Sequence, residues 1–232
     1  MPRPNVVILC GGLGTRLRPV ISDRPKVLAQ IGDQTFLDIL ITSLRKQGFK
    51  KIILCVGYLK DQIKDHFKHD HSITFSDEEE LLGTGGALKN ARSFIISNPF
   101  MVLNGDSLCK VDYQDFYDFH MRKRAIASMV LVRTKTSQDF GGVVVDISKR
   151  IINFKEKGDG GEGLVNVGIY LMQKHIFSLM PDMRTFSLEY DLFPKLVENK
   201  RCYGYITDSE LIDIGTPKRL KHYENIYRQC QC

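Results

Sequence analysis

The stretch Val6-Val7-Ile8-Leu9-Cys10-Gly11-Gly12-Leu13-Gly14-Thr15-Arg16-Leu17 joins a short apolar run to a glycine-rich turn that carries an arginine. An apolar run of this length that ends at glycines is typical of a buried strand. Glycine lets the loop adopt positive φ and approach a ligand closely, and successive backbone N–H groups form a concave anion site. The guanidinium of Arg16 suits phosphate oxygens. The stretch therefore predicts a strand that ends in a phosphate-binding loop.

This loop matches neither of two common glycine motifs. Leu17 stands where the dinucleotide fingerprint needs its third glycine, and Leu17-Arg18 stands where a Walker loop needs Gly-Lys. A glycine-rich turn after a strand is more often a tight turn than a ligand site. Arg16 and the downstream pair Pro25-Lys26 favour the ligand site, because they place two cations in or near the turn.

The bulk composition indicates an ordinary globular protein. The chain has 232 residues, of which 43% are hydrophobic and 26% charged, and its net charge is +6. We expect one domain over residues 1–232, with no membrane partner, because no apolar segment approaches about 18 residues. The densest basic cluster, Arg122-Lys123-Arg124, fits the end of a helix better than a nucleic-acid site.

The cysteines and the N-terminus indicate where the chain functions. The six cysteines include no C-x-x-C pair, and the beginning of the chain does not read as a signal peptide. We therefore expect a cytoplasmic protein with free thiols. The sequence leaves the oligomeric state open, and a homodimer is compatible with it.

Strands and helices alternate in the first half of the chain, which predicts a parallel sheet with crossover helices. The expected strands there span residues 6–10, 51–56, 72–75 and 100–103, and the expected helices span 36–47, 59–67 and 84–94. The second half is richer in strands, expected at 126–133, 142–146, 151–154, 165–171, 201–206 and 211–214, with helices at 192–199 and 217–227. Several of the later strands follow one another directly, which favours antiparallel pairing.

Two carboxylates follow or lie within apolar strand-like segments. Asp106 ends Asn104-Gly105-Asp106, and Asp213 lies in Ile212-Asp213-Ile214-Gly215-Thr216. Ligands of open α/β sheets bind at the carboxyl ends of strands, and Mg²⁺ takes one or two carboxylates together with substrate phosphates. Taken by itself, Asn-Gly-Asp is better explained as a turn after a strand. Asp213 is harder to explain as a structural residue, because it lies within an apolar stretch and an unpaired buried carboxylate is costly.

Three further motifs have weaker functional interpretations. Gly83-Thr84-Gly85-Gly86, preceded by Glu78-Glu79-Glu80, is either a flexible helix entrance or a flat surface for a nucleobase, with one acid accepting from a guanine edge. Lys157 and Asn166 are either ordinary surface and strand residues or ligands of a phosphate and of sugar hydroxyls. His66, His69 and His71 have metal-like spacing, but they lie in a polar turn with no neighbouring Cys, which disfavours a metal site.

Taken in order, these motifs resemble those of the sugar-phosphate nucleotidyltransferases, the NDP-sugar pyrophosphorylases. The match covers essentially the whole chain and consists of residues 11–17, Pro25-Lys26, Gly83-Thr84-Gly85-Gly86, Asn104-Gly105-Asp106, Glu156-Lys157, Asn166-Val167-Gly168 and Asp213-Ile214-Gly215-Thr216. The chain departs from the family at Val27, Gln30 and Gly158, where prolines are common. The resemblance implies a Rossmann-like, mixed but mostly parallel sheet flanked by helices, the nucleotide-diphospho-sugar transferase fold.

The resemblance also implies roles for individual residues. Arg16, Lys26 and Asp106 would act in catalysis, and Asp106 and Asp213 would hold Mg²⁺. The nucleotide would contact Gly11, Gly12, Gly14, Thr15, Glu80, Gly83, Gly85 and Asn104. The sugar 1-phosphate would contact Lys157, Asn166 and Glu189.

The implied reaction transfers GMP from GTP to D-glycero-α-D-manno-heptose 1-phosphate and releases pyrophosphate, in the synthesis of surface polysaccharide. The attacking phosphate is anionic near neutral pH, because the second pKa of a phosphate monoester is about 6, so no general base is needed. Alternatives are mannose 1-phosphate as acceptor, or uridylyl or thymidylyl transfer to a hexose or amino-sugar phosphate. A silent nucleotide-sugar binding module is a different class. A glycosyltransferase is disfavoured, because Asp213-Ile214-Gly215 is not an Asp-x-Asp motif.

Overall fold

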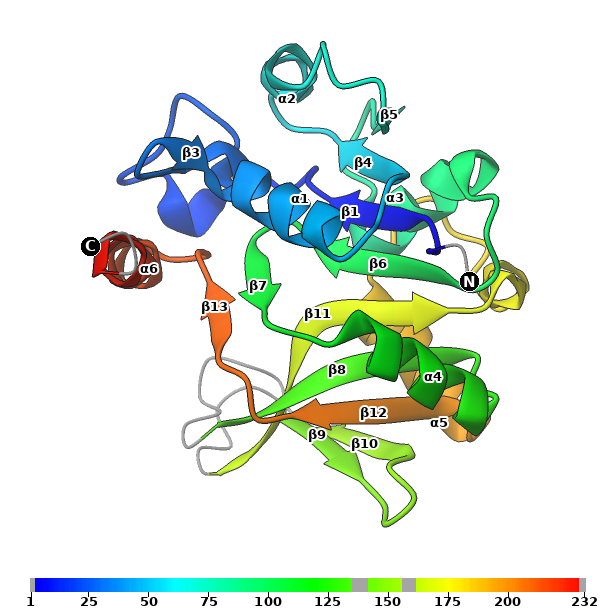
Figure 1. Ribbon diagram of the computed structural model, residues 1–232. Coiled ribbons are helices and arrows are strands. Elements are labelled where there is room, and N and C mark those ends of the chain that lie inside the picture. Colours follow the sequence, from blue (N-terminus) through cyan, green and yellow to red (C-terminus); the bar gives the residue numbers. More distant parts are fainter. Residues whose placement is uncertain (1–2, 135–141, 156–161, 230–232) are drawn as a thin grey trace.

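The computed structural model describes residues 3–134, 142–155 and 162–229, and its main feature is a nine-stranded mixed sheet (Figure 1). Its strands run in the order β10-β9-β11-β6-β1-β4-β5, with β8 pairing β11 and β12 pairing β8. They are β1 (Val6–Leu9), β4 (Ile52–Val56), β5 (Ile73–Asp77), β6 (Phe100–Asn104), β8 (Ala127–Thr134), β9 (Gly142–Val145), β10 (Ile151–Lys155), β11 (Gly163–Met172) and β12 (Cys202–Thr207).

The sheet is parallel around β1 and antiparallel around β11. β1 pairs in parallel with β4 and β6, and β4 pairs in parallel with β5. β11 runs antiparallel to β6, β8 and β9, while β12 runs parallel to β8. The parallel half therefore brings the carboxyl ends of β1, β4, β5 and β6 to one edge of the sheet, where ligands of open α/β sheets bind.

Helices cover both faces of this sheet. They are α1 (Phe36–Lys46), α2 (Lys60–His66), α3 (Gly83–Asn90), α4 (Tyr113–Lys123), α5 (Phe193–Glu198) and α6 (Pro217–Gln229). In Figure 1, α1 and α4 lie on the near side of the sheet and α5 lies behind it. Successive residues of β1 point to opposite faces, so Val6 and Ile8 pack with α1, α2 and α4, whereas Val7 packs with α3 and α5. The sheet is consequently buried on both sides.

The beginning of α1 shows how local sequence defines an element. Thr35 Oγ1 accepts a hydrogen bond from the Asp38 N–H at 3.2 Å, and Asp38 Oδ2 accepts one from the Thr35 N–H at 3.0 Å. This reciprocal capping box satisfies backbone donors that the first helical turn leaves unpaired. The apolar face of the helix then buries Leu37, Leu40 and Leu44 against the sheet.

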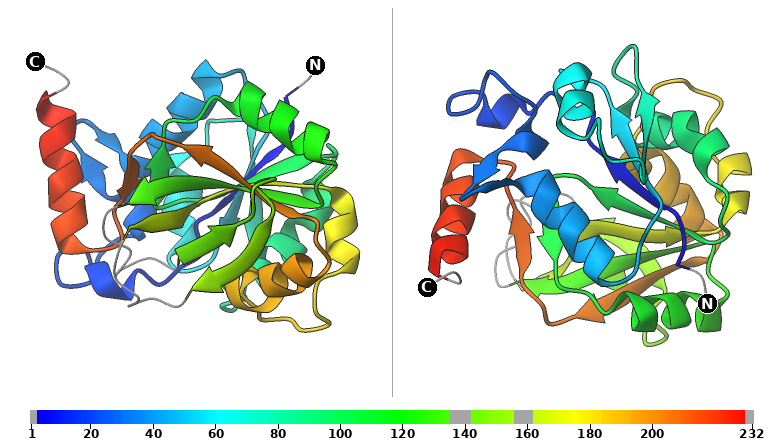
Figure 2. Two further views of the ribbon diagram at one scale, coloured as in Figure 1. Left: turned by 90° about the horizontal axis from the view of Figure 1, so that it is seen from below. Right: turned by 45° about the horizontal axis from the view of Figure 1, so that its top comes forward.

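Two short two-stranded sheets lie beside the large one. β2 (Gln30–Ile31) pairs with β3 (Gln34–Thr35), and β7 (Ser107–Cys109) pairs with β13 (Leu211–Asp213). Figure 2 shows α6 at one edge of the molecule, close to the β2–β3 hairpin. The β7–β13 pairing brings the segment around Asp213 next to the end of β6, although about a hundred residues separate them in the chain.

The predicted fold class is confirmed, with small differences in individual elements. The strand expected at residues 72–75 extends to Asp77, and the helix expected at 84–94 is α3 followed by a 3₁₀ turn at Ala91–Phe94. β7 and the π-helical turn Leu188–Leu192 were not predicted, since neither is long enough to show a periodic pattern. Within the described ranges, no helix has the length and apolar character needed to cross a membrane.

Candidate active site

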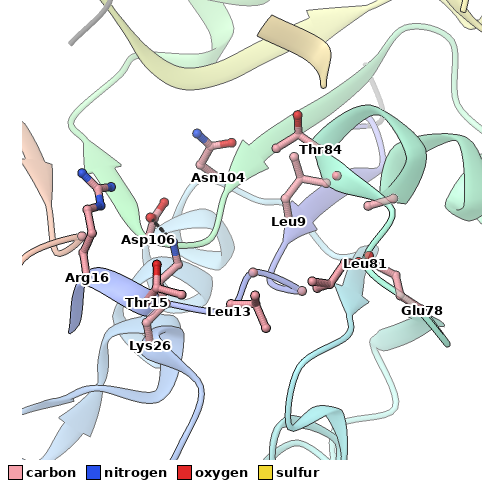
Figure 3. Close-up of a pocket in the computed structure, with 16 residues that line it drawn as sticks. Leu9, Leu13, Thr15, Arg16, Lys26, Glu78, Leu81, Thr84, Asn104 and Asp106 are labelled. Carbon is pink, nitrogen blue, oxygen red and sulfur yellow. Dashed lines mark hydrogen bonds and ion pairs between the residues drawn. The ribbon is translucent and has the colours of Figure 1, made fainter. Parts of the chain in front are cut away.

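A cavity of about 490 Å³ opens at the carboxyl ends of the parallel strands (Figure 3). Figure 3 shows Arg16, Lys26 and Asp106 at one end of this cavity and Leu81 and Glu78 at the other. The lining is completed by Leu9, Gly11, Gly12, Leu13, Gly14, Thr15, Gly83, Thr84, Ala87, Asn104 and Gly215. The cavity therefore has a charged end and a mainly apolar end.

The glycine loop after β1 supplies the backbone surface of the cavity. Gly14 has φ of 60°, a left-handed conformation that favours glycine, and it precedes the 3₁₀ turn Thr15–Leu17. Among the hydrogen bonds between described residues, none is donated by the backbone N–H groups of residues 11–14. Free N–H groups in such a loop form an anion site, so this part of the loop is suited to phosphate oxygens.

Lys26 and Asp106 form an ion pair at the charged end of the cavity. Lys26 Nζ donates to Asp106 Oδ2 at 2.5 Å, and the two side chains are 21% and 15% exposed. Burial raises the pKa of the Asp106 carboxyl, but the charge of Lys26 and its hydrogen bond outweigh burial, so the pKa lies below its ordinary value. Asp106 is therefore an anion that is neutralised by Lys26.

Asp213 lies next to this pair through backbone pairing, but it has a counter-ion of its own. The Ile214 N–H donates to the Asp106 carbonyl oxygen at 3.1 Å, which fixes the two segments together. Asp213 Oδ1 accepts from the Gly215 N–H at 2.8 Å and from Arg219 of α6 at 2.9 Å. A Cβ on Gly215 would lie 3.0 Å from the guanidinium of Arg16, so Arg16 also reaches this corner.

Glu78 is a buried carboxylate at the apolar end of the cavity. It follows the last residue of β5 and is 6% exposed. Its Oε2 accepts from the Leu82 N–H at 3.3 Å, while its buried Oε1 has no hydrogen-bond partner among the described residues. Burial raises the pKa of this carboxyl. An unsatisfied buried acceptor is costly, and its position in a cavity indicates that a ligand donor completes it.

The glycines that open α3 have a packing role as well as a place at the site. Gly83 lines the cavity with φ of 71°, whereas Gly85 does not line it. A Cβ on Gly85 would overlap the ring of Phe186, whose carbonyl oxygen accepts from the Gly85 N–H at 2.9 Å. The lack of a side chain at Gly85 thus allows Phe186 to pack closely against α3. A contact of Gly85 with the base remains a prediction.

Asn104 ends β6 inside the cavity and depends on a glycine in the neighbouring strand. Its Oδ1 is buried and has no hydrogen-bond partner in the part of the chain that the structure describes. Gly168 of β11 has φ of 78°, and a Cβ at that position would overlap the amide of Asn104. Gly168 falls where the β11–β8 register shifts between Asn166 and Tyr170. The glycine is therefore required by both the backbone bend and the space that Asn104 occupies.

Asn166 and Glu189 belong to a hydrogen-bonded network that reaches the cavity at Thr84. Asn166 Nδ2 donates to Tyr170 Oη at 2.8 Å, and Tyr170 Oη donates to Glu189 Oε1 at 3.2 Å. Glu189 Oε2 accepts from Thr84 Oγ1 at 2.8 Å. Lys157, the third predicted contact for the sugar phosphate, lies outside the described residues.

The structure thus gathers some of the predicted site residues and separates others. The predicted residues that line the cavity are Gly11, Gly12, Gly14, Thr15, Arg16, Lys26, Gly83, Asn104 and Asp106. Glu80 is not among the lining residues; its side chain is 53% exposed and pairs with Arg184 at 2.8 Å. Glu78 lines the cavity where Glu80 was expected. The end of β5 could have indicated Glu78, because the first residue after a parallel strand lies at the ligand edge, but the strand was expected to stop two residues earlier.

The histidine cluster has a structural partner. His66 Nε2 lies 2.9 Å from Asp38 Oδ1, so this side chain links α2 to the capping box of α1. Across the part of the chain that the structure describes, no group of three or more His, Cys, Asp and Glu side chains could hold a metal ion.

Comparison with known proteins identifies the family. The model of the nucleotidyl transferase family matches residues 5–229. The chain belongs to the nucleotidyl transferase family. Within this family, the chain is 39% identical over 229 residues to D-glycero-α-D-manno-heptose 1-phosphate guanylyltransferase of Aneurinibacillus thermoaerophilus, an alignment that covers 94% of this chain and 99% of that protein.

Two further nucleotidyl transferase relatives are informative. Mannose-1-phosphate guanylyltransferase of Mycobacterium tuberculosis is 33% identical over 221 residues, covering 92% of this chain and 62% of that protein. The crystal structure of HddC from Yersinia pseudotuberculosis complexed with GMP-PN superimposes with a TM-score of 0.86 at 34% identity, covering 97% of this chain and 99% of that chain. The predicted family and the predicted enzyme class, a nucleotidyltransferase, are confirmed.

Proposed function

We propose that this nucleotidyltransferase transfers GMP from GTP to a sugar 1-phosphate, with D-glycero-α-D-manno-heptose 1-phosphate as the acceptor, and releases pyrophosphate. The GDP-sugar would serve surface polysaccharide synthesis in the cytoplasm. The observation that carries the proposal is the unpartnered Glu78 Oε1 at the apolar end of a cavity whose other end is lined by a phosphate-type glycine loop. The names of the guanylyltransferase relatives also support guanylyl transfer to a sugar 1-phosphate.

The carboxylate of Glu78 favours guanine among the common bases. Guanine presents two adjacent donors, N1–H and N2–H, and a carboxylate accepts two such bonds at once. Adenine has an acceptor at N1, and uracil and thymine present one donor between two acceptors. Leu81 and Leu13 offer apolar surface for the faces of the base. Guanine therefore satisfies an acceptor that the other bases would leave partly unpaired.

The charged end of the cavity suits the triphosphate. The backbone N–H groups of residues 11–14, which donate to no described residue, would donate to phosphate oxygens, and Arg16 and Lys26 would add positive charge. Since Lys26 is paired with Asp106, it would have to transfer from this carboxylate to a phosphate oxygen. Asn104 Oδ1, which has no partner among the described residues, would accept a hydrogen bond from a hydroxyl of the nucleotide.

The residues present fit a magnesium ion that is shared with substrate. Asp106 and Asp213 come from adjoining segments, and both are anionic acceptors beside a phosphate-binding loop. With only two carboxylates, the remaining ligands would be phosphate oxygens and water. Bound there, Mg²⁺ would neutralise charge on the triphosphate and on the departing pyrophosphate.

The chemistry needs alignment more than proton transfer. An oxygen of the sugar 1-phosphate attacks the α-phosphorus, forms the new P–O bond, and pyrophosphate leaves from the opposite side. The nucleophile is already anionic, because its second pKa is about 6. Arg16 and Lys26 would hold and neutralise the phosphates so that two anions can approach. Asn166 and Glu189 would orient the sugar, together with Lys157.

The experiment that tests this function is pyrophosphate release with Mg²⁺, crossing GTP, ATP, UTP, CTP and dTTP with a panel of sugar 1-phosphates. Release restricted to GTP with the heptose 1-phosphate would support the full proposal. Preference for mannose 1-phosphate would retain guanylyl transfer and change the acceptor. Preference for UTP or dTTP would contradict the role of Glu78. Nucleotide binding without release with any pair would indicate a silent binding module.

A further inference from the structure

The hydroxyl of Tyr170 lies at the meeting point of the sugar-side residues and the nucleotide cavity. Tyr170 is on β11, is fully buried, and its ring packs against Phe193 of α5 with 4.9 Å between ring centroids. A phenylalanine would fill the same space. The hydroxyl is therefore not needed for packing, and its burial is costly unless it is hydrogen-bonded.

That hydroxyl is satisfied by two side chains from different elements. Asn166 Nδ2 donates to it at 2.8 Å, and the hydroxyl donates to Glu189 Oε1 at 3.2 Å. One bond is therefore made within β11 and the other crosses to the π-helical turn Leu188–Leu192. The three groups form a chain in which the direction of each donor is fixed.

The bond to Tyr170 fixes the orientation of the Asn166 amide. Asn166 Oδ1 accepts from the Gly168 N–H at 2.9 Å, so the oxygen is held by the bend in β11. The nitrogen then carries two hydrogens, of which Tyr170 takes one. The second hydrogen is left pointing in a defined direction, which suits an acceptor on a sugar.

Glu189 is held from both of its oxygens. Oε2 accepts from Thr84 Oγ1 and Ser187 Oγ, each at 2.8 Å, while Oε1 is held by Tyr170. Thr84 in turn accepts from the Leu188 N–H at 2.9 Å and lines the cavity. The carboxylate is thus kept in one orientation, with lone pairs remaining for sugar hydroxyls.

We propose that Tyr170 is a positioning residue for the acceptor sugar: without touching substrate, its hydroxyl holds Asn166 and Glu189 in the orientations that bind the sugar 1-phosphate. The proposal rests on the proposed function. Removal of the hydroxyl frees the Asn166 amide and one Glu189 oxygen, but it leaves the glycine loop, Lys26 and Glu78 unchanged. The loss should therefore fall on the acceptor and not on the nucleotide.

The test is Tyr170→Phe, with kinetics for both substrates. We expect KM for the heptose 1-phosphate to rise by about tenfold or more, because Asn166 and Glu189 would no longer be held in the orientations that bind the sugar. The Kd for GTP with Mg²⁺, measured by calorimetry, should change by less than about twofold. A purely structural role predicts instead that both substrates and the thermal midpoint are affected together, and that result would overturn the proposal.

Tyr205→Phe is the matched control. Tyr205 Oη donates to Asp115 Oδ2 at 2.7 Å, a tyrosine–carboxylate bond between β12 and α4 that does not line the cavity. This variant should leave both substrate constants at the wild-type value. An equal rise in the acceptor KM in Tyr205→Phe would show that loss of any such bond produces the effect, and would overturn the assignment to Tyr170.

A double-mutant cycle with Glu189→Gln provides a second test. If Tyr170 acts through Glu189, the effects of the two substitutions on acceptor KM will be non-additive in the double variant. Independent, additive effects would overturn the positioning role. Turnover by the wild-type chain separates the two proposals. If the wild type turns over and Tyr170→Phe has the same acceptor KM, the positioning role alone is overturned. If the wild type turns over no pair of nucleotide and sugar 1-phosphate, both proposals are overturned.

Discussion

Lys26 Nζ and Asp106 Oδ2 lie 2.5 Å apart, so the carboxylate expected to hold a metal is already neutralised by the lysine expected to hold phosphate. The second such carboxylate, Asp213, is likewise paired with Arg219 at 2.9 Å. A free divalent cation must compete with these internal cations for the same oxygens. A metal–nucleotide complex has an advantage, because its phosphates offer Lys26 an alternative partner. Cation binding and nucleotide binding should therefore be coupled.

Substitution Lys26→Met tests this coupling. The variant should lose turnover, yet in the absence of nucleotide it should bind Mn²⁺ more tightly than the wild type, by roughly tenfold, since one charge-assisted bond no longer competes. Electron paramagnetic resonance of free Mn²⁺ measures the affinity directly. Lys64→Met, which removes an ion pair with Asp77 at 2.8 Å, is the control and should leave Mn²⁺ affinity unchanged. Weaker or equal Mn²⁺ binding by Lys26→Met would contradict the competition.

Asp106→Ala should abolish turnover and leave the fold intact. The substitution removes a predicted metal ligand and leaves Lys26, which is partly exposed, able to reach solvent. We expect pyrophosphate release to fall by about a thousandfold or more, with the circular dichroism spectrum unchanged. Asp70→Ala removes a carboxylate paired with Arg45 away from the cavity and should retain activity. Rates like those of the wild type in Asp106→Ala would rule out its role as a ligand.

Glu78→Gln should change both base preference and stability. A glutamine offers one acceptor and one donor, so GTP loses a bond while UTP and dTTP gain a matching partner. Selectivity for GTP over UTP should fall by about tenfold or more. Competition assays with the two nucleotides measure it. Retained selectivity would show that the base is read elsewhere.

The same variant reveals the cost of the buried carboxyl. Burial raises the pKa of Glu78 in the folded chain, so the folded state binds its proton more tightly than the unfolded state. Wild-type stability should then decrease as the pH rises from the unfolded pKa through the folded one. Glu78→Gln removes this loss, and its thermal midpoint should exceed that of the wild type at pH 8 by more than at pH 4.

Gly168→Ala should destabilise the fold and impair activity together. Gly168 has φ of 78°, and a Cβ would overlap the Asn104 amide, which must move. The strain alone should cost about 1 kcal/mol or more in the free energy of unfolding, measured by urea titration. Gly163→Ala is a control at the beginning of the same strand, where a Cβ would meet nothing within 4 Å. Equal effects of the two substitutions would refute the importance of the contact.

His120 should make stability sensitive to mild acid. It is fully buried on α4, with Nδ1 2.9 Å from Ser128 Oγ, and burial lowers its pKa to about 4. Because the folded pKa lies below the unfolded value, stability is complete above about pH 6.5 and is lost as the pH falls towards 4. The expected loss is about 3 kcal/mol, at about 1.4 kcal/mol per pH unit between the two pKa values.

The measurement is the difference in unfolding free energy between the wild type and His120→Gln at several pH values. Subtraction removes the contribution of acidic residues that titrate in both proteins. The difference should change between pH 6.5 and 4 and be constant above pH 7. A difference that does not vary with pH would show that His120 has the same pKa in the folded and unfolded chain, which would contradict the effect of burial.

The sequence by itself determined the alternation of elements, the glycine-rich loop after the first strand and the family. These features are local: an apolar run followed by Gly11–Gly14, and carboxylates that end apolar strands, each act within a few residues. The alternation of strands and helices along the chain was enough to predict a mostly parallel sheet, since the connections in βαβ units follow restricted topologies.

Only the tertiary structure decided which side chains meet. Glu78 rather than Glu80 enters the cavity because β5 continues to Asp77, and strand length depends on pairing with β4. Lys26 reaches Asp106, and Tyr170 joins Asn166 to Glu189, through contacts between elements that the sequence does not order in space. Such contacts depend on sheet register and on close packing at glycines such as Gly168, and neither leaves a periodic signal in the chain.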